Sequence, residues 1–296
     1  MAPPISKTAF VLIAALAGAV PAHAVQLDYV GTHVWSVDHP DFGGFSGLEI
    51  SDDGSEYIAL SDRATIWWGK IRRGSAGAIR GLSVAGSTRL KRSDGTPLQP
   101  GYLGDSEGLA LGKDGSLWVS FEGLTRVVRF ASPDAPSEPL PSPPAFKDFP
   151  PNGSLEALAV MDDGTLLTMP ERSGANDRPF PVFRYRDGEW DQPFSVPRDD
   201  NWLPVGADVG PDGRLYLLKR RFQGIFGFSS RVWRYDIEDD ALTNGELLLE
   251  STPSQYDNLE GLAVWADGLG IRLTMISDDN FFFLQRTELV EYRVRD

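Results

Sequence analysis

The segment Glu107–Glu122 reads EGLALGKDGSLWVSFE. In it, the apolar run EGLAL precedes a polar turn at Asp114-Gly115, and a second apolar run, SLWVSF, follows. Asp-Gly supplies the positive φ angles that a tight turn between antiparallel strands requires. The segment therefore predicts a β-hairpin.

The same pattern occurs four more times, around the Asp-Gly pairs that begin at Asp53, Asp163, Asp212 and Asp267. Successive aspartates are 61, 49, 49 and 55 residues apart. Each hairpin is followed by a third apolar run, such as TIWWGKI, RVVRFA or SRVWRYDI, and weaker fourth runs follow in LSVAGSTRL and GELLLES. Four antiparallel strands at a period near 50 residues are typical of a β-propeller, so we predict an all-β fold of this kind.

The ends of the chain favour five blades. The last repeat stops after its third strand, whereas a spare strand, QLDYVGTHVWS, precedes the first repeat. If this N-terminal strand completes the last blade, the ring closes without an exposed sheet edge. The alternative is six blades, with a degenerate blade between Leu82 and Leu103. A segment with eight prolines, Ser132 to Pro151, is expected to be a surface excursion.

The first 24 residues differ from the rest of the chain. Lys7 precedes the apolar run AFVLIAALAGAV, and the segment ends in Ala22-His23-Ala24. This pattern is typical of a cleaved signal peptide, so we expect a periplasmic or secreted protein with a single domain over residues 25–296. The apolar run is too short to span a bilayer and no later stretch reaches about 20 apolar residues, so we expect no transmembrane segment.

The composition limits the classes of partner. The chain has no cysteine, which excludes a disulfide framework, and a formal net charge of -14, which disfavours nucleic acid as a partner. The sequence says nothing about the oligomeric state.

One motif suggests a serine hydrolase. Gly104-Asp105-Ser106-Glu107-Gly108 fits G-x-S-x-G, the nucleophile elbow of α/β-hydrolases. That elbow needs a strand before the serine and a helix after it, but Ser106 follows a turn-rich segment and precedes a predicted strand. We therefore expect the match to be accidental.

The repeat alignment indicates a different site. Seven residues before each Asp-Gly aspartate lie Ser46, Glu107, Glu156, Val205 and Glu260, each followed by glycine or alanine. The second strands end at Asp62-Arg63, Glu122, Glu171-Arg172, Lys219-Arg220 and Asp278-Asp279-Asn280. In a propeller, the starts of the first strands and the ends of the second strands meet at one mouth of the central channel. A ring of carboxylates there repels itself unless a cation compensates, and carboxylate oxygens without histidine or cysteine suit Ca²⁺.

With these residues in hand, the chain resembles the "esterase-like activity of phytase" family of exported bacterial proteins. The matching stretches are FSGLEIS from Phe45, DSEGLAL from Asp105, LEALAV from Leu155, NLEGLAVW from Asn258 and, most specifically, SDDNFFFLQRTELVEY from Ser277. The resemblance covers nearly all of the chain after residue 24. It implies hydrolysis of a small anionic ester or phosphoester, aided by a metal.

A metal-assisted phosphoesterase would give the residues at the mouth the following roles. Glu107, Glu156, Glu260 and Asp279 are expected to hold a divalent cation, with Ca²⁺ favoured, and Glu122 or Glu171 to act as general base. Arg63, Arg172, Lys219 and Arg220 are expected to bind the anionic substrate. The alternatives are a metal-dependent lactonase and a non-catalytic propeller of the cell envelope that binds a sugar, peptide or protein partner.

Overall fold

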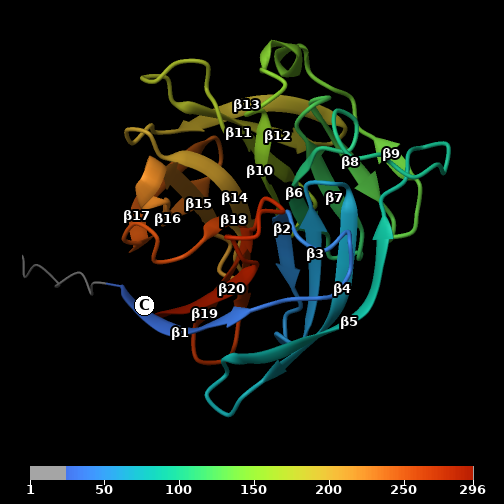
Figure 1. The fold of residues 1–296 in the computed structure, drawn as a ribbon. Helices are drawn as coiled ribbons and strands as arrows, with labels where there is room; N and C mark the ends of the chain where they lie inside the picture. Colours follow the sequence, from blue (N-terminus) through green and yellow to red (C-terminus); the bar gives the residue numbers. More distant parts are fainter. Residues whose placement is uncertain (1–24, 296) are drawn as a thin grey trace, which may run out of the picture.

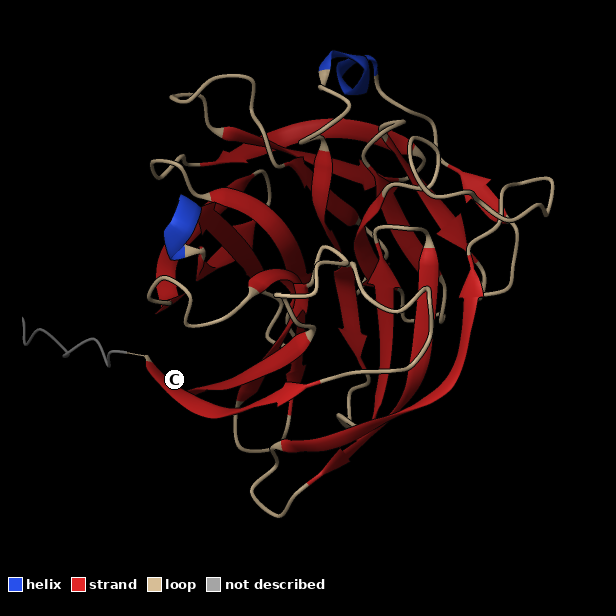
Figure 2. Ribbon diagram, in the orientation of Figure 1, coloured by secondary structure: helices blue, strands red, loops and turns tan. Residues whose placement is uncertain are grey.

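The five predicted hairpins form the inner halves of five four-stranded antiparallel sheets. A computed structural model describes residues 25–295, and the sheets surround a central axis as the blades of a propeller (Figures 1 and 2). The predicted signal peptide, residues 1–24, lies outside the described residues. Within the described part of the chain, no helix is long and apolar enough to cross a bilayer.

The first four blades follow the order of the chain, with the innermost strand first. Blade 1 contains β2 (Phe45–Ile50), β3 (Glu56–Ser61), β4 (Thr65–Arg73) and β5 (Ile79–Arg89). Blade 2 contains β6 (Ser106–Leu111), β7 (Leu117–Phe121), β8 (Arg126–Phe130) and β9 (Ser137–Pro139). Blade 3 contains β10 (Leu155–Val160), β11 (Leu166–Pro170), β12 (Phe180–Arg186) and β13 (Glu189–Val196). Blade 4 contains β14 (Leu203–Val209), β15 (Leu215–Phe222), β16 (Phe228–Glu238) and β17 (Ala241–Glu250).

Blade 5 joins the two ends of the described chain. It contains β18 (Asn258–Ala266), β19 (Ile271–Asp278) and β20 (Glu288–Arg295), and its outer strand is β1 (Gln26–Val34). β1 pairs with β20 from Gln26 opposite Arg295 to Val34 opposite Glu288. The predicted five-bladed ring and its closure by the N-terminal strand are thus confirmed.

The segment that could have held a sixth blade has another structure. It contains the end of β5 and a short hairpin marked by a bridge between Lys91 and Pro97. The six-bladed alternative is therefore wrong. The proline-rich segment is also more than a surface excursion, because it supplies β9, the outer strand of blade 2, and then the short 3₁₀ helix η1 (Pro144–Asp148).

The hydrophobic core lies largely between neighbouring blades. Trp35 and Phe45, for example, are stacked with ring centroids 5.1 Å apart in a cluster shared by blades 5 and 1. At the repeated glycine of the inner strands there is no room for a side chain. A Cβ atom on Gly206 of β14 would lie 2.3 Å from the backbone oxygen of Glu260 on β18. The repeated glycine thus lets inner strands of adjacent blades approach each other closely.

Candidate functional site

A β-bulge interrupts each inner strand near its start, at the end of the channel that is called the mouth. The pairing of inner and second strands shifts register at this point in all five blades. The bulges include the five residues that the repeat alignment singled out, Ser46, Glu107, Glu156, Val205 and Glu260. A bulge bends its strand and re-aims a side chain, which explains why carboxylates recur at these places.

A second set of equivalent residues follows from the register. The residues just beyond the pairs Phe45–Ser61, Ser106–Phe121 and Leu155–Pro170 on the second strands are Asp62, Glu122 and Glu171. In blades 4 and 5 the corresponding residues are Arg220 and Asp278. The mouth therefore has an outer ring of four carboxylates and one arginine.

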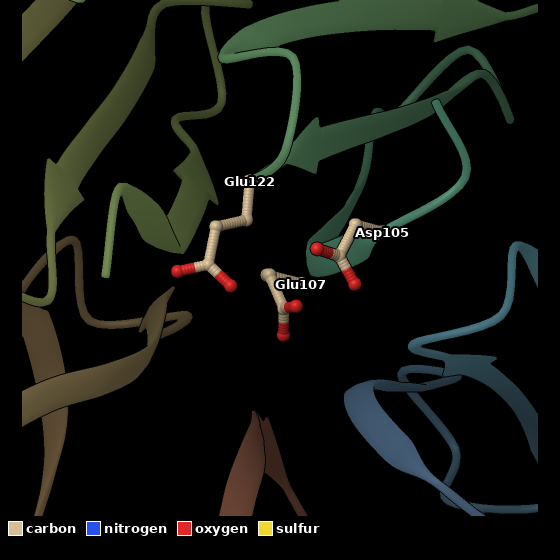
Figure 3. Close-up of side chains that lie close together, drawn as sticks. All are labelled: Asp105, Glu107 and Glu122. Atoms are coloured by element: carbon tan, nitrogen blue, oxygen red, sulfur yellow. The ribbon is translucent and has the colours of Figure 1, made fainter. Parts of the chain in front are cut away.

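Three carboxylates of blade 2 lie closest together. Asp105, Glu107 and Glu122 each offer an oxygen, and these oxygens lie within 4.8 Å of one another (Figure 3). Glu107 and Glu122 are each 8% exposed. The N–H of Ser154 in the next blade donates a 3.1 Å hydrogen bond to Glu122 Oε1, which fixes that side chain. Three oxygens at this separation form a possible site for a hard cation.

The electrostatics of the mouth show a deficit of positive charge. Burial, then the charge of Glu156, raises the pKa of Glu107 well above its usual range. Burial raises the pKa of Glu122 to about 7, although the N–H of Ser154 opposes this shift. Within residues 25–295, neither carboxylate has an ion-pair partner. Each must therefore hold a proton or lie beside a cation that the chain itself does not supply.

Carboxylates of blades 1, 5 and 3 at the mouth also have raised pKa values. Burial, then the charge of Asp278, raises the pKa of Asp62 to about 7, and burial raises that of Asp278 to about 6. Burial also raises the pKa of Glu156 well above its usual range, and there the charge of Glu171 adds to the shift while Arg220 opposes it.

Arg220 makes the mouth asymmetric. Its guanidinium donates hydrogen bonds to Glu171 Oε1 at 3.0 Å, to Asn258 Oδ1 at 3.0 Å and to Glu260 Oε1. Glu171 and Glu260 are thus neutralised from blade 4, whereas the carboxylates of blade 2 are not. This arrangement pairs a positive side of the mouth with a cation-deficient side.

Two residues that the sequence assigned to the mouth are engaged in other contacts. Lys219 is 1% exposed, and its Nζ donates a 2.6 Å hydrogen bond to Asp199 inside blade 4. Successive residues of a strand point to opposite faces, so Arg220 faces the mouth and Lys219 cannot. Asp279 Oδ1 accepts the backbone N–H groups of Gly44 and Phe281, at 2.9 and 3.0 Å, which gives this carboxylate a loop-fixing role.

The other two predicted arginines lie next to the outer ring in the chain. Arg63 lies over the ring of Phe281, with its guanidinium carbon 3.2 Å from the centroid. Arg172 donates a 3.3 Å hydrogen bond to Glu171 Oε2, and its side chain is 58% exposed. Arg172 therefore remains accessible to an anionic ligand.

Ser106 is part of the structural frame. It is 0% exposed, its Oγ donates a 2.6 Å hydrogen bond to the carbonyl of Ser61, and the N–H of Ala64 donates to the same Oγ at 3.0 Å. These bonds tie blade 2 to blade 1. The residue lies on β6 with no helix after it, so the nucleophile elbow is absent.

We predict that Ser106→Ala leaves any hydrolytic kcat within about threefold of the wild type, because the hydroxyl is not available to a substrate. The lost buried hydrogen bonds should lower the free energy of unfolding by about 1–3 kcal/mol. Urea unfolding and steady-state kinetics on the same preparation measure both. A thousandfold loss of kcat in a folded variant would contradict this assignment.

The sequence analysis did not identify Asp62, Asp105 or Asp278 individually as site residues. Asp62 and Asp278 appeared only within the runs at the strand ends, where counting from Asp-Gly does not fix which residue faces inward. The signal for Asp105 is its spacing, two residues before Glu107, because residues i and i+2 of a strand share a face.

Comparison with known proteins decides the family. A family model described as esterase-like activity of phytase matches residues 40–281. The chain belongs to this phytase-like family. The match includes Asp105, Glu107, Glu122 and Arg220, so the whole cluster lies within the family domain. No curated protein sequence is significantly similar to the chain.

Two of the solved structures similar to this phytase-like protein have TM-scores above 0.5 and share its overall fold. The PQQ-bound aldose sugar dehydrogenase of Streptomyces coelicolor is 15% identical, with 93% of this chain and 100% of that chain covered and a TM-score of 0.51. The α-L-arabinofuranosidase PaAbf62A of Podospora anserina is 13% identical, with coverages of 92% and 97% and a TM-score of 0.55. A gluconolactonase of Xanthomonas campestris is 16% identical, with coverages of 85% and 72% and a TM-score of 0.45. At such identities the likeness concerns the fold alone.

Proposed function

We propose that this phytase-like protein is an exported hydrolase of small phosphoesters, with a divalent cation bound at the mouth of the propeller. The observation that carries the proposal is the cluster of Asp105, Glu107 and Glu122, whose oxygens converge within 4.8 Å without an ion-pair partner among residues 25–295. The pattern of residues 1–24 supports export.

The donor set fits a hard divalent cation. Asp105, Glu107 and Glu122 offer only carboxylate oxygens, the ligands that Ca²⁺ prefers. Burial raises the pKa of each of them, and a bound cation would favour their ionised forms. These three residues would hold the ion, with Glu156 next to them in blade 3. A cation bound there would polarise a phosphoryl oxygen and lower the pKa of a water molecule.

Arginine side chains of the mouth supply the recognition of an anion. Arg220 is held by Glu171 and Glu260 in a fixed orientation, and its contacts leave part of its fork of N–H donors free for a phosphate oxygen. The exposed Arg172 offers a second set of donors close to Glu171.

Glu156 is the carboxylate that remains for the role of general base. Glu122 belongs to the cation cluster and Glu171 is paired with Arg220 and Arg172, so both of the carboxylates favoured from the sequence have other partners. Glu156 is 5% exposed and has no ion-pair partner within residues 25–295. It would take the proton of the attacking water.

The test is to purify residues 25–296 without chelator, measure bound metals, and assay p-nitrophenyl phosphate and bis-p-nitrophenyl phosphate with Ca²⁺ or with EDTA. We expect phosphoester hydrolysis that depends on the cation. Glu107→Gln removes one negative ligand at constant size and should lower kcat/KM about a hundredfold.

The matched control is Glu138→Gln, an exposed carboxylate on β9, which should keep the wild-type rate. An assay of p-nitrophenyl acetate and a γ-lactone under the same conditions separates the alternatives. Lactone hydrolysis alone would favour the lactonase. Cation binding without hydrolysis of any of these substrates would favour the non-catalytic propeller.

A further inference from the structure

A cleft lies away from the mouth, between blades 1 and 2. Its volume is about 420 Å³, and its walls are formed largely by Tyr57, Ile58, Trp68, Leu111 and Pro133. Leu111 ends β6, and Pro133 lies in the turn after β8. The ends of these strands lie opposite the starts of the inner strands, so the cleft opens at the other end of the propeller. A volume of this size accommodates a small organic molecule.

One carboxylate lies at the inner side of this otherwise mainly apolar cleft. Glu49 of β2 is 9% exposed, and its Oε1 accepts a 3.0 Å hydrogen bond from the N–H of Leu111. Within residues 25–295, no donor reaches its second oxygen and no lysine or arginine forms an ion pair with it. A buried carboxylate without a cationic partner is unfavourable unless it is protonated or receives one.

The groups around Glu49 leave its charge uncompensated. Burial raises its pKa well above the usual range, and the charge of Asp208 on β14 adds to this shift. Asp208 itself accepts the N–H groups of Val209 and Val264, at 2.7 and 2.6 Å. At the rim, Lys70 is already 3.9 Å from Glu56, so it does not serve as the counter-ion of Glu49.

We propose that this cleft binds a small organic cation, an amine with an aromatic or aliphatic body, with Glu49 as its anionic partner. The ammonium group would donate to the free oxygen of Glu49, and its body would pack on Trp68 and Ile58. Aromatic walls attract cations through the ring faces, and a chain of formal charge -14 attracts them over longer distances. The site is independent of hydrolysis at the mouth.

Titration calorimetry with benzylammonium tests the proposal, with benzyl alcohol as the neutral analogue. We expect saturable binding of the cation and at least about tenfold weaker binding of the alcohol. Glu49→Gln keeps the acceptor for Leu111 N–H but removes the charge. It should therefore weaken the binding of benzylammonium at least about tenfold and leave the binding of benzyl alcohol unchanged.

Three further variants locate the binding. Ala85→Trp starts from an exposed residue of the cleft wall, should fill the cleft without disturbing the core, and is expected to abolish binding with an unchanged melting curve. Glu138→Gln on β9, outside the cleft lining, and Glu107→Gln at the mouth should bind benzylammonium as the wild type does. Absence of saturable binding, or loss of binding in Glu107→Gln but not in Glu49→Gln, would overturn the proposal.

Discussion

Deletion of residues 25–34, which removes β1 and leaves Trp35 in place, should lower the melting temperature by about 10 °C or more, or abolish cooperative unfolding. Without β1, the N–H and C=O groups of β20 become an exposed sheet edge along most of its length. Leu27 also packs against the core cluster of blades 4 and 5. Loss of the strand therefore removes both a ladder of hydrogen bonds and buried apolar area.

Thermal unfolding followed by circular dichroism measures the effect, and size-exclusion chromatography reports association through the new edge. The control is full-length Trp35→Ala, which removes a buried ring but keeps the closure, and should cost about 3–5 kcal/mol. If the deletion variant melted at the wild-type temperature, the ring would not depend on β1 for closure.

The fold was predictable because its signals are local and repeated. Each hairpin has its own Asp-Gly turn, and the missing last strand and the spare first strand complement each other. β9 was not predictable, since three residues between prolines carry no strand pattern and an outer strand tolerates proline.

The sequence was sufficient to predict a ring of acidic residues at the mouth, but not every residue that belongs to this ring. Counting from Asp-Gly locates the bulge residues, because the inner strands are similar, but the second strands end at different distances from the turn. Ile50 pairs with Tyr57 in blade 1, whereas Leu111 pairs with Leu117 in blade 2. One residue of difference reverses the face. For this reason Asp278 takes the place expected for Asp279, and only Arg220 of the predicted pair Lys219 and Arg220 faces the mouth.

The free energy of unfolding of the metal-free protein should fall as the pH rises from about 4 to 7. The folded-state pKa of Asp62, about 7, lies above the value of 3.8 expected in the unfolded chain. The folded state therefore binds the proton more tightly, so the stability from this group is complete below about pH 4 and is lost as the pH rises through 7. Asp278, with a pKa of about 6, acts in the same direction.

At about 1.4 kcal/mol per pKa unit, the shift of Asp62 corresponds to roughly 4 kcal/mol. Solvent at the mouth reduces this value, so we expect a loss of roughly 2–4 kcal/mol between pH 5 and 8, or about 5–10 °C in Tm. Below pH 4 the free energy of unfolding should fall again, because carboxylates such as Asp267 then become protonated. Burial tends to raise the pKa of Asp267, but hydrogen bonds from Arg293 and Arg272 hold it at about 2 in the folded state.

Differential scanning calorimetry from pH 4 to 8 in EDTA, and then in Ca²⁺, measures this dependence. If Ca²⁺ binds the ionised mouth as proposed, it should restore stability mainly at the high-pH end, by about 2.7 kcal/mol at a hundred times its Kd. Asp62→Asn should flatten the profile in EDTA, whereas Asp162→Asn, an exposed carboxylate paired with Lys113, should leave it unchanged. A Tm that is constant from pH 5 to 8 in EDTA would mean that the chain itself compensates these carboxylates, and the argument for a cation at the mouth would lose its electrostatic basis.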